Sequence, residues 1–89
     1  LWSGDYAAAA ARFEPLVAKD PGDLTRAAGF VAALANVDPP LAEQLRLAEK
    51  VAATSGAQKS DDPVFLGNLA WVLHRAGDTA GSNRVLDRV

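Results

Sequence analysis

The sequence predicts an all-α fold of about five helices. Alanine is the most frequent of the 89 residues, and it has the highest intrinsic helix propensity. No segment alternates polar and apolar residues in the way that a half-buried strand requires. Short segments rich in glycine, aspartate and proline divide the chain. These observations favour helices joined by short turns over a sheet.

An aspartate precedes each expected helix, because an N-cap carboxylate can accept hydrogen bonds from free amides of the first turn. Proline is also tolerated there, since its missing N–H would have no partner. Four short connections among five helices imply antiparallel hairpins. The expected caps are Asp5, Asp23, Asp38, Asp62 and Asp78, and they predict helices over residues 6–19, 24–36, 40–54, 63–76 and 79–89.

The first and last helices begin with a similar sequence pattern. Each follows a Gly-Asp turn, with a small residue four positions after the aspartate and a large apolar residue four positions later. Pro15 lies inside the first helix and removes the hydrogen bond to the carbonyl of Ala11, which predicts a bend. The repetition indicates a repeated helical unit. The matching pairs are Gly4 and Gly77, Ala9 and Ser82, and Phe13 and Leu86.

With these units the chain resembles the tetratricopeptide repeat (TPR) family, whose unit of about 34 residues is a helical hairpin ending near a proline. Tyr6 opens the second helix of the first unit, and Pro21 is its closing proline. Val31 departs from the small residue of the family, and the link "SGAQKSDD" is longer than usual. The remaining matches are Ala27, Phe30 and Leu34 in the second unit and Leu66, Leu69, Ala70 and Leu73 in the third.

The resemblance covers nearly the whole chain and implies an α-solenoid of antiparallel helical hairpins, a right-handed superhelix. It implies one repeat domain over residues 1–89, with hairpins at about 1–20, 23–55 and 62–89. The first residues, "LWSGD", read like the end of a helix entering a turn. We therefore expect a fragment of a longer array.

In this family the first helices of successive hairpins line a concave groove, which places residues 24–36 and 63–76 there. Helical spacing puts Leu66 and Leu69 on the core face of the later helix, and Trp71 and His74 on roughly the opposite face. Alanines beside one tryptophan suit an apolar or helical partner segment. The expected groove residues are Thr25, Ala28, Ala32, Ala35, Asn36, Val64, Gly67, Asn68, Trp71, His74 and Arg75.

Two alternative interpretations apply to the predicted groove residues. Trp71 could pack against a neighbouring hairpin instead, since large aromatic side chains are more often buried than displayed. Asn68 and Arg75 could belong to a solvated helix face. Some family members grip a peptide carboxylate with lysine, arginine and asparagine, but no lysine lies on these helices here. Such a chaperone-type use is not expected.

Composition and spacing argue against several other functions. The formal charge is −2 and the basic residues are dispersed, so nucleic acid is not an expected partner. There is no cysteine, and the longest apolar run, residues 27–37, is shorter than the roughly 20 residues that span a bilayer. We expect neither membrane insertion nor a thiolate metal site, and the sequence leaves the compartment open.

No catalytic set, metal site or cofactor site is expected. His74 is the only histidine, and Asp78, four residues later, is better explained as a helix cap. Asp61 and Asp62 fit a turn and a cap better than a catalytic pair. The turn glycines are isolated, without a phosphate-binding run. Local surface pairing best explains Glu43 and Glu49 beside Arg46 and Lys50.

These interpretations favour a non-catalytic protein-interaction or scaffold module that binds a protein or peptide segment. An alternative is a structural spacer or self-association unit of a larger bacterial TPR protein, serving envelope assembly or polysaccharide export as alanine-rich family members often do. Uncovered Val85, Leu86 and Val89 would favour self-association through the terminal helix. A regulatory appendage of an enzyme whose catalytic part lies outside residues 1–89 is a third hypothesis.

Overall fold

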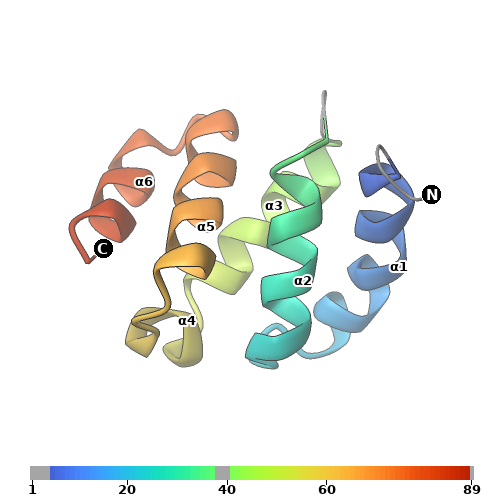
Figure 1. The fold of residues 1–89 in the computed structure, drawn as a ribbon, viewed down its shortest axis with the longest axis horizontal. Helices are drawn as coiled ribbons and strands as arrows, with labels where there is room; N and C mark the ends of the chain where they lie inside the picture. Colours follow the sequence, from blue (N-terminus) through green and yellow to red (C-terminus); the bar gives the residue numbers. More distant parts are fainter. Residues whose placement is uncertain (1–4, 38–40, 89) are drawn as a thin grey trace.

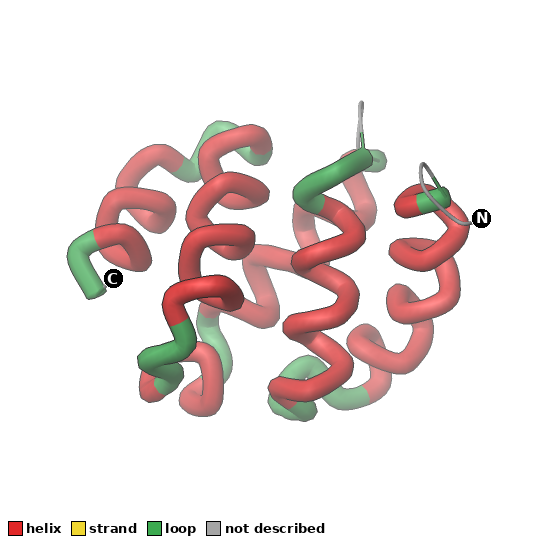
Figure 2. The backbone as a smooth tube through the Cα atoms, in the orientation of Figure 1, coloured by secondary structure: helices red, strands yellow, loops and turns green. Residues whose placement is uncertain are grey.

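All secondary structure in the described residues is helical, which confirms the predicted all-α class (Figure 2). The structure is a computed structural model that describes residues 5–37 and 41–88. Its helices are α1 (Tyr6–Lys19), α2 (Leu24–Leu34), α3 (Ala42–Ala52), α4 (Ser55–Lys59), α5 (Pro63–Arg75) and α6 (Thr79–Leu86).

Three of the five expected caps form. Asp23, Asp62 and Asp78 accept hydrogen bonds from amides of the following helix, at 3.4, 3.0 and 2.9 Å. The prediction for Asp5 is wrong in part: it is the N-cap residue of α1, but its side chain makes no capping bond. Its ψ of 34° departs from the extended backbone that usually turns an N-cap side chain toward the first amides. Asp38 lies outside the described residues.

Most helix starts agree with the prediction, whereas several helix ends come earlier. α2 ends at Leu34 rather than at residue 36, and α6 ends at Leu86 rather than at residue 89, which lies outside the described residues. α3 begins at residue 42 rather than 40, because Leu41 is its N-cap and donates its amide to Gln44 Oε1 at 3.2 Å. By accepting this bond, the buried Gln44 fixes the first turn of α3.

The segment 55–62 was expected to be a simple connection, and that prediction is wrong because it contains α4. Thr54 caps this short helix. Its hydroxyl oxygen accepts from the amide of Ala57 at 3.2 Å and donates to the carbonyl of Val51 at 2.7 Å. One side chain thus closes the end of α3 and opens α4. The buried Ala57 then holds α4 against the core.

Apart from the short α4, consecutive helices alternate in direction, and α1, α2, α5 and α6 follow one another along the longest axis (Figure 1). The most extensive helix contacts join α1 to α2 and α5 to α6. α3 lies behind α2 in this view, where it packs against α1, α5 and, less extensively, α2. α5 also packs against α2, so it connects the two halves. The principal extents are 34 × 23 × 23 Å.

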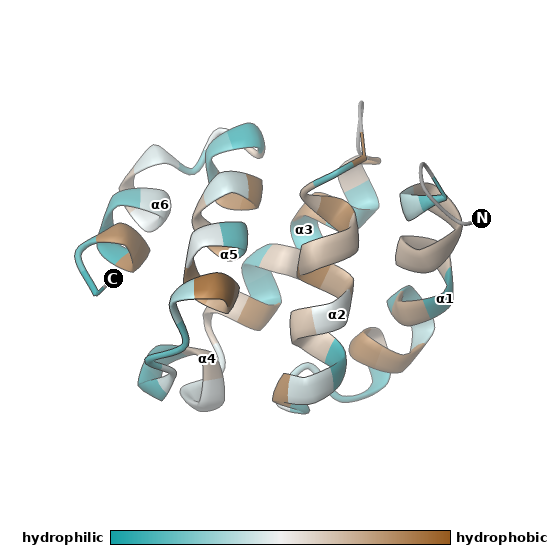
Figure 3. Ribbon diagram, viewed as in Figure 1, coloured by the Kyte–Doolittle hydropathy of each residue, from teal (hydrophilic) through white to brown (hydrophobic). Residues whose placement is uncertain are grey.

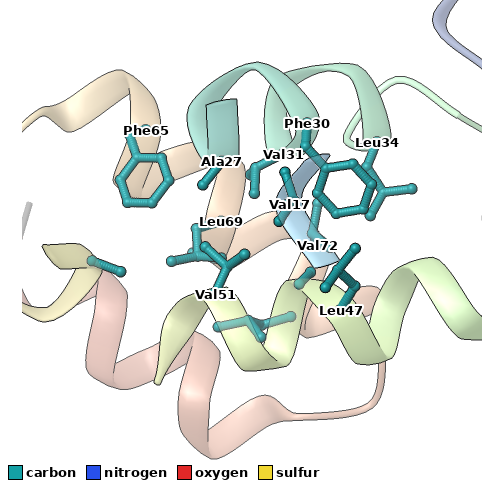
Figure 4. Close-up of a cluster of buried hydrophobic side chains, with 14 of the residues drawn as sticks. Val17, Ala27, Phe30, Val31, Leu34, Leu47, Val51, Phe65, Leu69 and Val72 are labelled. Atoms are coloured by element: carbon teal, nitrogen blue, oxygen red, sulfur yellow. The ribbon is translucent and has the colours of Figure 1, made fainter. Parts of the chain in front are cut away.

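One hydrophobic cluster joins these helices. Its members include Val17 of α1, Phe30 of α2, Val51 of α3 and Leu69 of α5 (Figure 4). The core residues predicted for α2 and α5 are buried, but Phe65 and Val72 of α5 are buried as well. Because α5 contacts α2, α3 and α6, more than one of its faces lies inside.

The hydrophilic segments lie outside this core. Hydrophilic colours mark the loop before α5 and the last turn of the chain (Figure 3).

A close approach between α1 and α2 explains the position of Phe13 in the first repeated unit. The half-buried ring of Phe13 packs on Gly29, where an added Cβ would lie 2.6 Å from Cζ of Phe13. In the α5–α6 pair, the small residue Ser82 is buried and donates its hydroxyl to the carbonyl of Ala70 at 2.8 Å. Small residues thus set the spacing in both of the tightest helix pairs.

We expect Gly29→Ala to lower the free energy of unfolding by about 1–2 kcal/mol. Alanine gains about 1 kcal/mol of helix propensity over glycine, but crowding a packed contact typically costs about 1–3 kcal/mol, and the clash with the Phe13 ring places this site near the upper end. Urea unfolding followed by circular dichroism measures the change. Adding Phe13→Leu should restore part of the loss. An increase in stability for Gly29→Ala alone would contradict the close contact.

Candidate functional site

Trp71 stands on the outward face of α5 with 52% of its surface exposed. Its ring stacks with that of His74, with centroids 6.1 Å apart and planes inclined by 24°. The guanidinium carbon of Arg75 lies 5.9 Å from the centroid of the Trp71 ring. The i, i+3 and i+4 spacing brings these three side chains together on one helix surface. Trp71 is therefore displayed on the described surface and is held by its helix neighbours.

A hollow of about 360 Å³ joins Trp71 to the end of α2. It is open, and we call it the α2–α5 hollow; its lining residues are Ala35, Asn36, Val37, Trp71 and Arg75. Ala35 is the C-cap of α2, and the Asn36 side-chain amide donates to the carbonyl of Ala32 at 2.9 Å. The early end of α2 thus opens the space beside Trp71.

A second hollow of about 230 Å³ lies on the other side of Trp71, between α5 and α6. Two of its small residues, Ala70 and Ser82, lie where the two helices meet, since the Ser82 hydroxyl donates to the carbonyl of Ala70. Leu86 contributes an apolar side chain that is 50% exposed. The full lining is Gly67, Ala70, Trp71, His74, Ser82, Asn83 and Leu86.

The structure brings only some of the predicted groove residues together. Four of them, Ala35, Asn36, Trp71 and Arg75, line the α2–α5 hollow, and Gly67 and His74 meet Trp71 in the second hollow. The other five line neither of these hollows. Thr25 and Val64 are exposed near the starts of α2 and α5, whereas Ala28, Ala32 and Asn68 are half-buried along the helices.

Five lining residues were not predicted as groove residues: Val37, Ala70, Ser82, Asn83 and Leu86. Val37 lies in a segment read only as a turn, although it follows Leu34 by three residues and thus continues the apolar spacing of α2. Asn83 and Leu86 line the second hollow because α6 packs closely on α5, and small residues on both helices are the sequence signal for that packing.

The exposure of the terminal helix bears on the self-association hypothesis. Leu86 is half-exposed and Val85 is buried, while Val89 lies outside the described residues. Self-association through α6 stays a prediction.

The charged residues of α3 are not paired as expected. Between described residues the structure has one ion pair, from Arg26 Nε to Asp23 at 3.6 Å, and none within α3. Exposed pairs contribute little, so long side chains such as Lys50 and Arg46 gain little from being held beside Glu43 or Glu49. Asp62 caps α5, and its neighbour Asp61 is exposed.

The described part of the chain contains no group of three or more histidine, aspartate or glutamate side chains placed to hold a metal ion. Among the same residues, no helix has both the length and the apolar character needed to cross a membrane. The exposed Trp71 and its two hollows form the candidate site, whose chemistry is that of apolar contact, aromatic stacking and a few polar groups. No family model, no curated protein and no solved structure matches the chain.

Proposed function

We propose that the chain is a non-catalytic protein-binding module, built as a TPR-like row of helical hairpins. The order of α1, α2, α5 and α6 along the longest axis supports a row (Figure 1). The turn after α5 supports the repeat motif. Gly77 has a positive φ of 88°, which glycine adopts without strain, and the amide of Asp78 closes the helix by donating to Leu73 O at 3.0 Å.

The observation that carries the proposal is the exposed Trp71 beside the α2–α5 hollow. Tryptophan is enriched among the residues that dominate binding energy, because its large surface loses water when a partner covers it. The hollow adds an alanine and a valine to accept an apolar side chain, and Asn36 and Arg75 at its edge can orient a polar backbone. The partner is thus a short segment carrying one exposed apolar anchor.

In this proposal the partner lies along the outward faces of α2 and α5, with its anchor in the α2–α5 hollow. Ala28 and Ala32 are half-buried on α2, so their small side chains let a segment approach the helix backbone. The cationic and imidazole groups next to Trp71 keep its ring in place by stacking. Less side-chain freedom is then lost on binding, which favours affinity.

A peptide selected from a random library against the wild-type protein tests this proposal. Ala32→Glu should weaken its binding by at least about tenfold, since a carboxylate would be buried beneath the peptide without a partner. Titration calorimetry measures the affinity. Ala11→Glu, at an exposed position of α1, is the matched control and should leave the affinity unchanged. Equal affinity for the wild type and Ala32→Glu would show that the peptide binds elsewhere.

A further inference from the structure

A larger hollow lies between α3 and α6, and Trp71 is not among its lining residues. It has a volume of about 480 Å³, within the roughly 300–1,000 Å³ range of small-molecule sites, and we call it the α3–α6 cleft. α3 and α6 are not among the helix pairs in extensive contact, so this space separates them. Its lining residues are Glu49, Ala52, Ala53, Gln58, Leu73, Asp78, Gly81, Arg84, Val85 and Arg88.

The floor of the cleft is apolar. Leu73 of α5 and Val85 of α6 reach it, although both are almost completely buried. Ala52 and Ala53 continue this surface along the end of α3. An aliphatic side chain placed here would lose contact with water on several sides, which is favourable in proportion to the apolar area that it buries.

The walls carry opposite charges, and two of the four charged groups already have structural roles. Arg88 donates from Nη2 to the carbonyl of Ser60 at 2.6 Å, and Asp78 accepts from the amide of Gly81 at 2.9 Å. Arg84 on the α6 wall and Glu49 on the α3 wall have no ion pair with any described residue. These two groups are available to a ligand.

We propose that the α3–α6 cleft binds a small zwitterion with an aliphatic side chain, of the chemistry of an apolar α-amino acid. The ligand carboxylate accepts from Arg84, whose planar guanidinium suits a carboxylate, and the ammonium donates to Glu49. The aliphatic group lies on Leu73 and Val85. A purely anionic ligand would meet Glu49 and Asp78, and a purely cationic one would meet both arginines, so a ligand with both charges fits best.

Three ligands of the same aliphatic shape test the proposal on the whole chain. L-leucine carries both charges, 4-methylpentanoate lacks the ammonium and 3-methylbutylamine lacks the carboxylate. Titrations followed by ¹H–¹⁵N correlation spectra should shift the amides of Ala52, Gly81 and Val85 with leucine. Leucine should bind about two- to fivefold more tightly than either single-charge analogue, because an ion pair with an exposed group such as Glu49 or Arg84 contributes roughly that factor. The dipeptide leucyl-alanine, as a further arm, distinguishes a peptide source from a free amino acid.

Two variants test which side chain of the cleft binds each charged group of the ligand. Arg84→Gln should weaken leucine binding about two- to fivefold and leave binding of 3-methylbutylamine unchanged, whereas Glu49→Gln should weaken leucine binding by a similar factor and leave binding of 4-methylpentanoate unchanged. Arg12→Gln and Glu43→Gln are matched controls at exposed positions outside the cleft. The proposal is overturned if leucine shifts no cleft amide up to its solubility limit, if 4-methylpentanoate binds as tightly as leucine, or if the controls weaken leucine equally.

Discussion

Phe30→Ala should lower the free energy of unfolding by about 3–5 kcal/mol, the usual range for removing a buried aromatic ring. Phe30 has 0% of its surface exposed and belongs to the cluster in which α1, α2, α3 and α5 meet (Figure 4). No single neighbouring helix can move to fill the space without losing contact with another. Domains of this size are stable by only about 5–15 kcal/mol, so the variant should lose a large part of its stability.

Urea unfolding followed by circular dichroism measures this change, with Val64→Ala as the control. Val64 lies on α5 with 71% of its surface exposed, so its truncation should change stability by less than about 0.5 kcal/mol. A similar loss for both variants would mean that Phe30 is not at the centre of the core. Partial unfolding of Phe30→Ala before any urea is added would agree with the prediction.

Trp71→Ala is expected to weaken binding of the selected peptide at least about 30-fold, equivalent to about 2 kcal/mol. The side chain offers a large exposed surface between the α2–α5 hollow and the hollow beside α6, so a partner that covers it removes apolar area from water on both sides. Stability should change much less than affinity, because Trp71 contributes little to the core. This difference between binding and folding is the signature of a displayed anchor.

Calorimetry with the peptide and urea unfolding together test this prediction. Leu16→Ala removes an exposed apolar side chain from α1 and should leave peptide affinity unchanged. If Trp71→Ala bound the peptide as tightly as the wild type, the candidate site would be wrong. If Trp71→Ala instead unfolded as readily as Phe30→Ala, the tryptophan would be a packing residue, which was the alternative considered from the sequence.

Capping and proline signals predicted most helix starts correctly, because a helix start depends on residues that are close in the sequence. Asp62 caps α5 and Pro63 fits its first turn, so both signals coincide at one position. α4 was missed because it has only five residues and no apolar period, although Thr54 supplied a capping signal. The short α4 is stabilised by Ala57 packing on the core, which a reading of neighbouring residues does not include.

The site was harder to predict because it depends on where helices end and on which helices meet. Trp71 and His74 were placed on the outward face by spacing alone, and both are exposed. The contribution of Val37 depends on the early end of α2, and that of Leu86 depends on how α6 packs against α5. Helical periodicity assigns a face to each residue, but tertiary contacts decide which faces meet.

The α2–α5 hollow exists only if α2 and α5 lie side by side with their C-terminal ends together. The chain has no cysteine, so a spin label on Asn36→Cys would be the only label, and its paramagnetic broadening of α5 amides reports proximity. A helix of 13 residues is about 20 Å long, enough for a clear gradient. We expect strong broadening over residues 71–75 and weak broadening over residues 64–67. The reverse gradient, or none, would contradict the shared hollow.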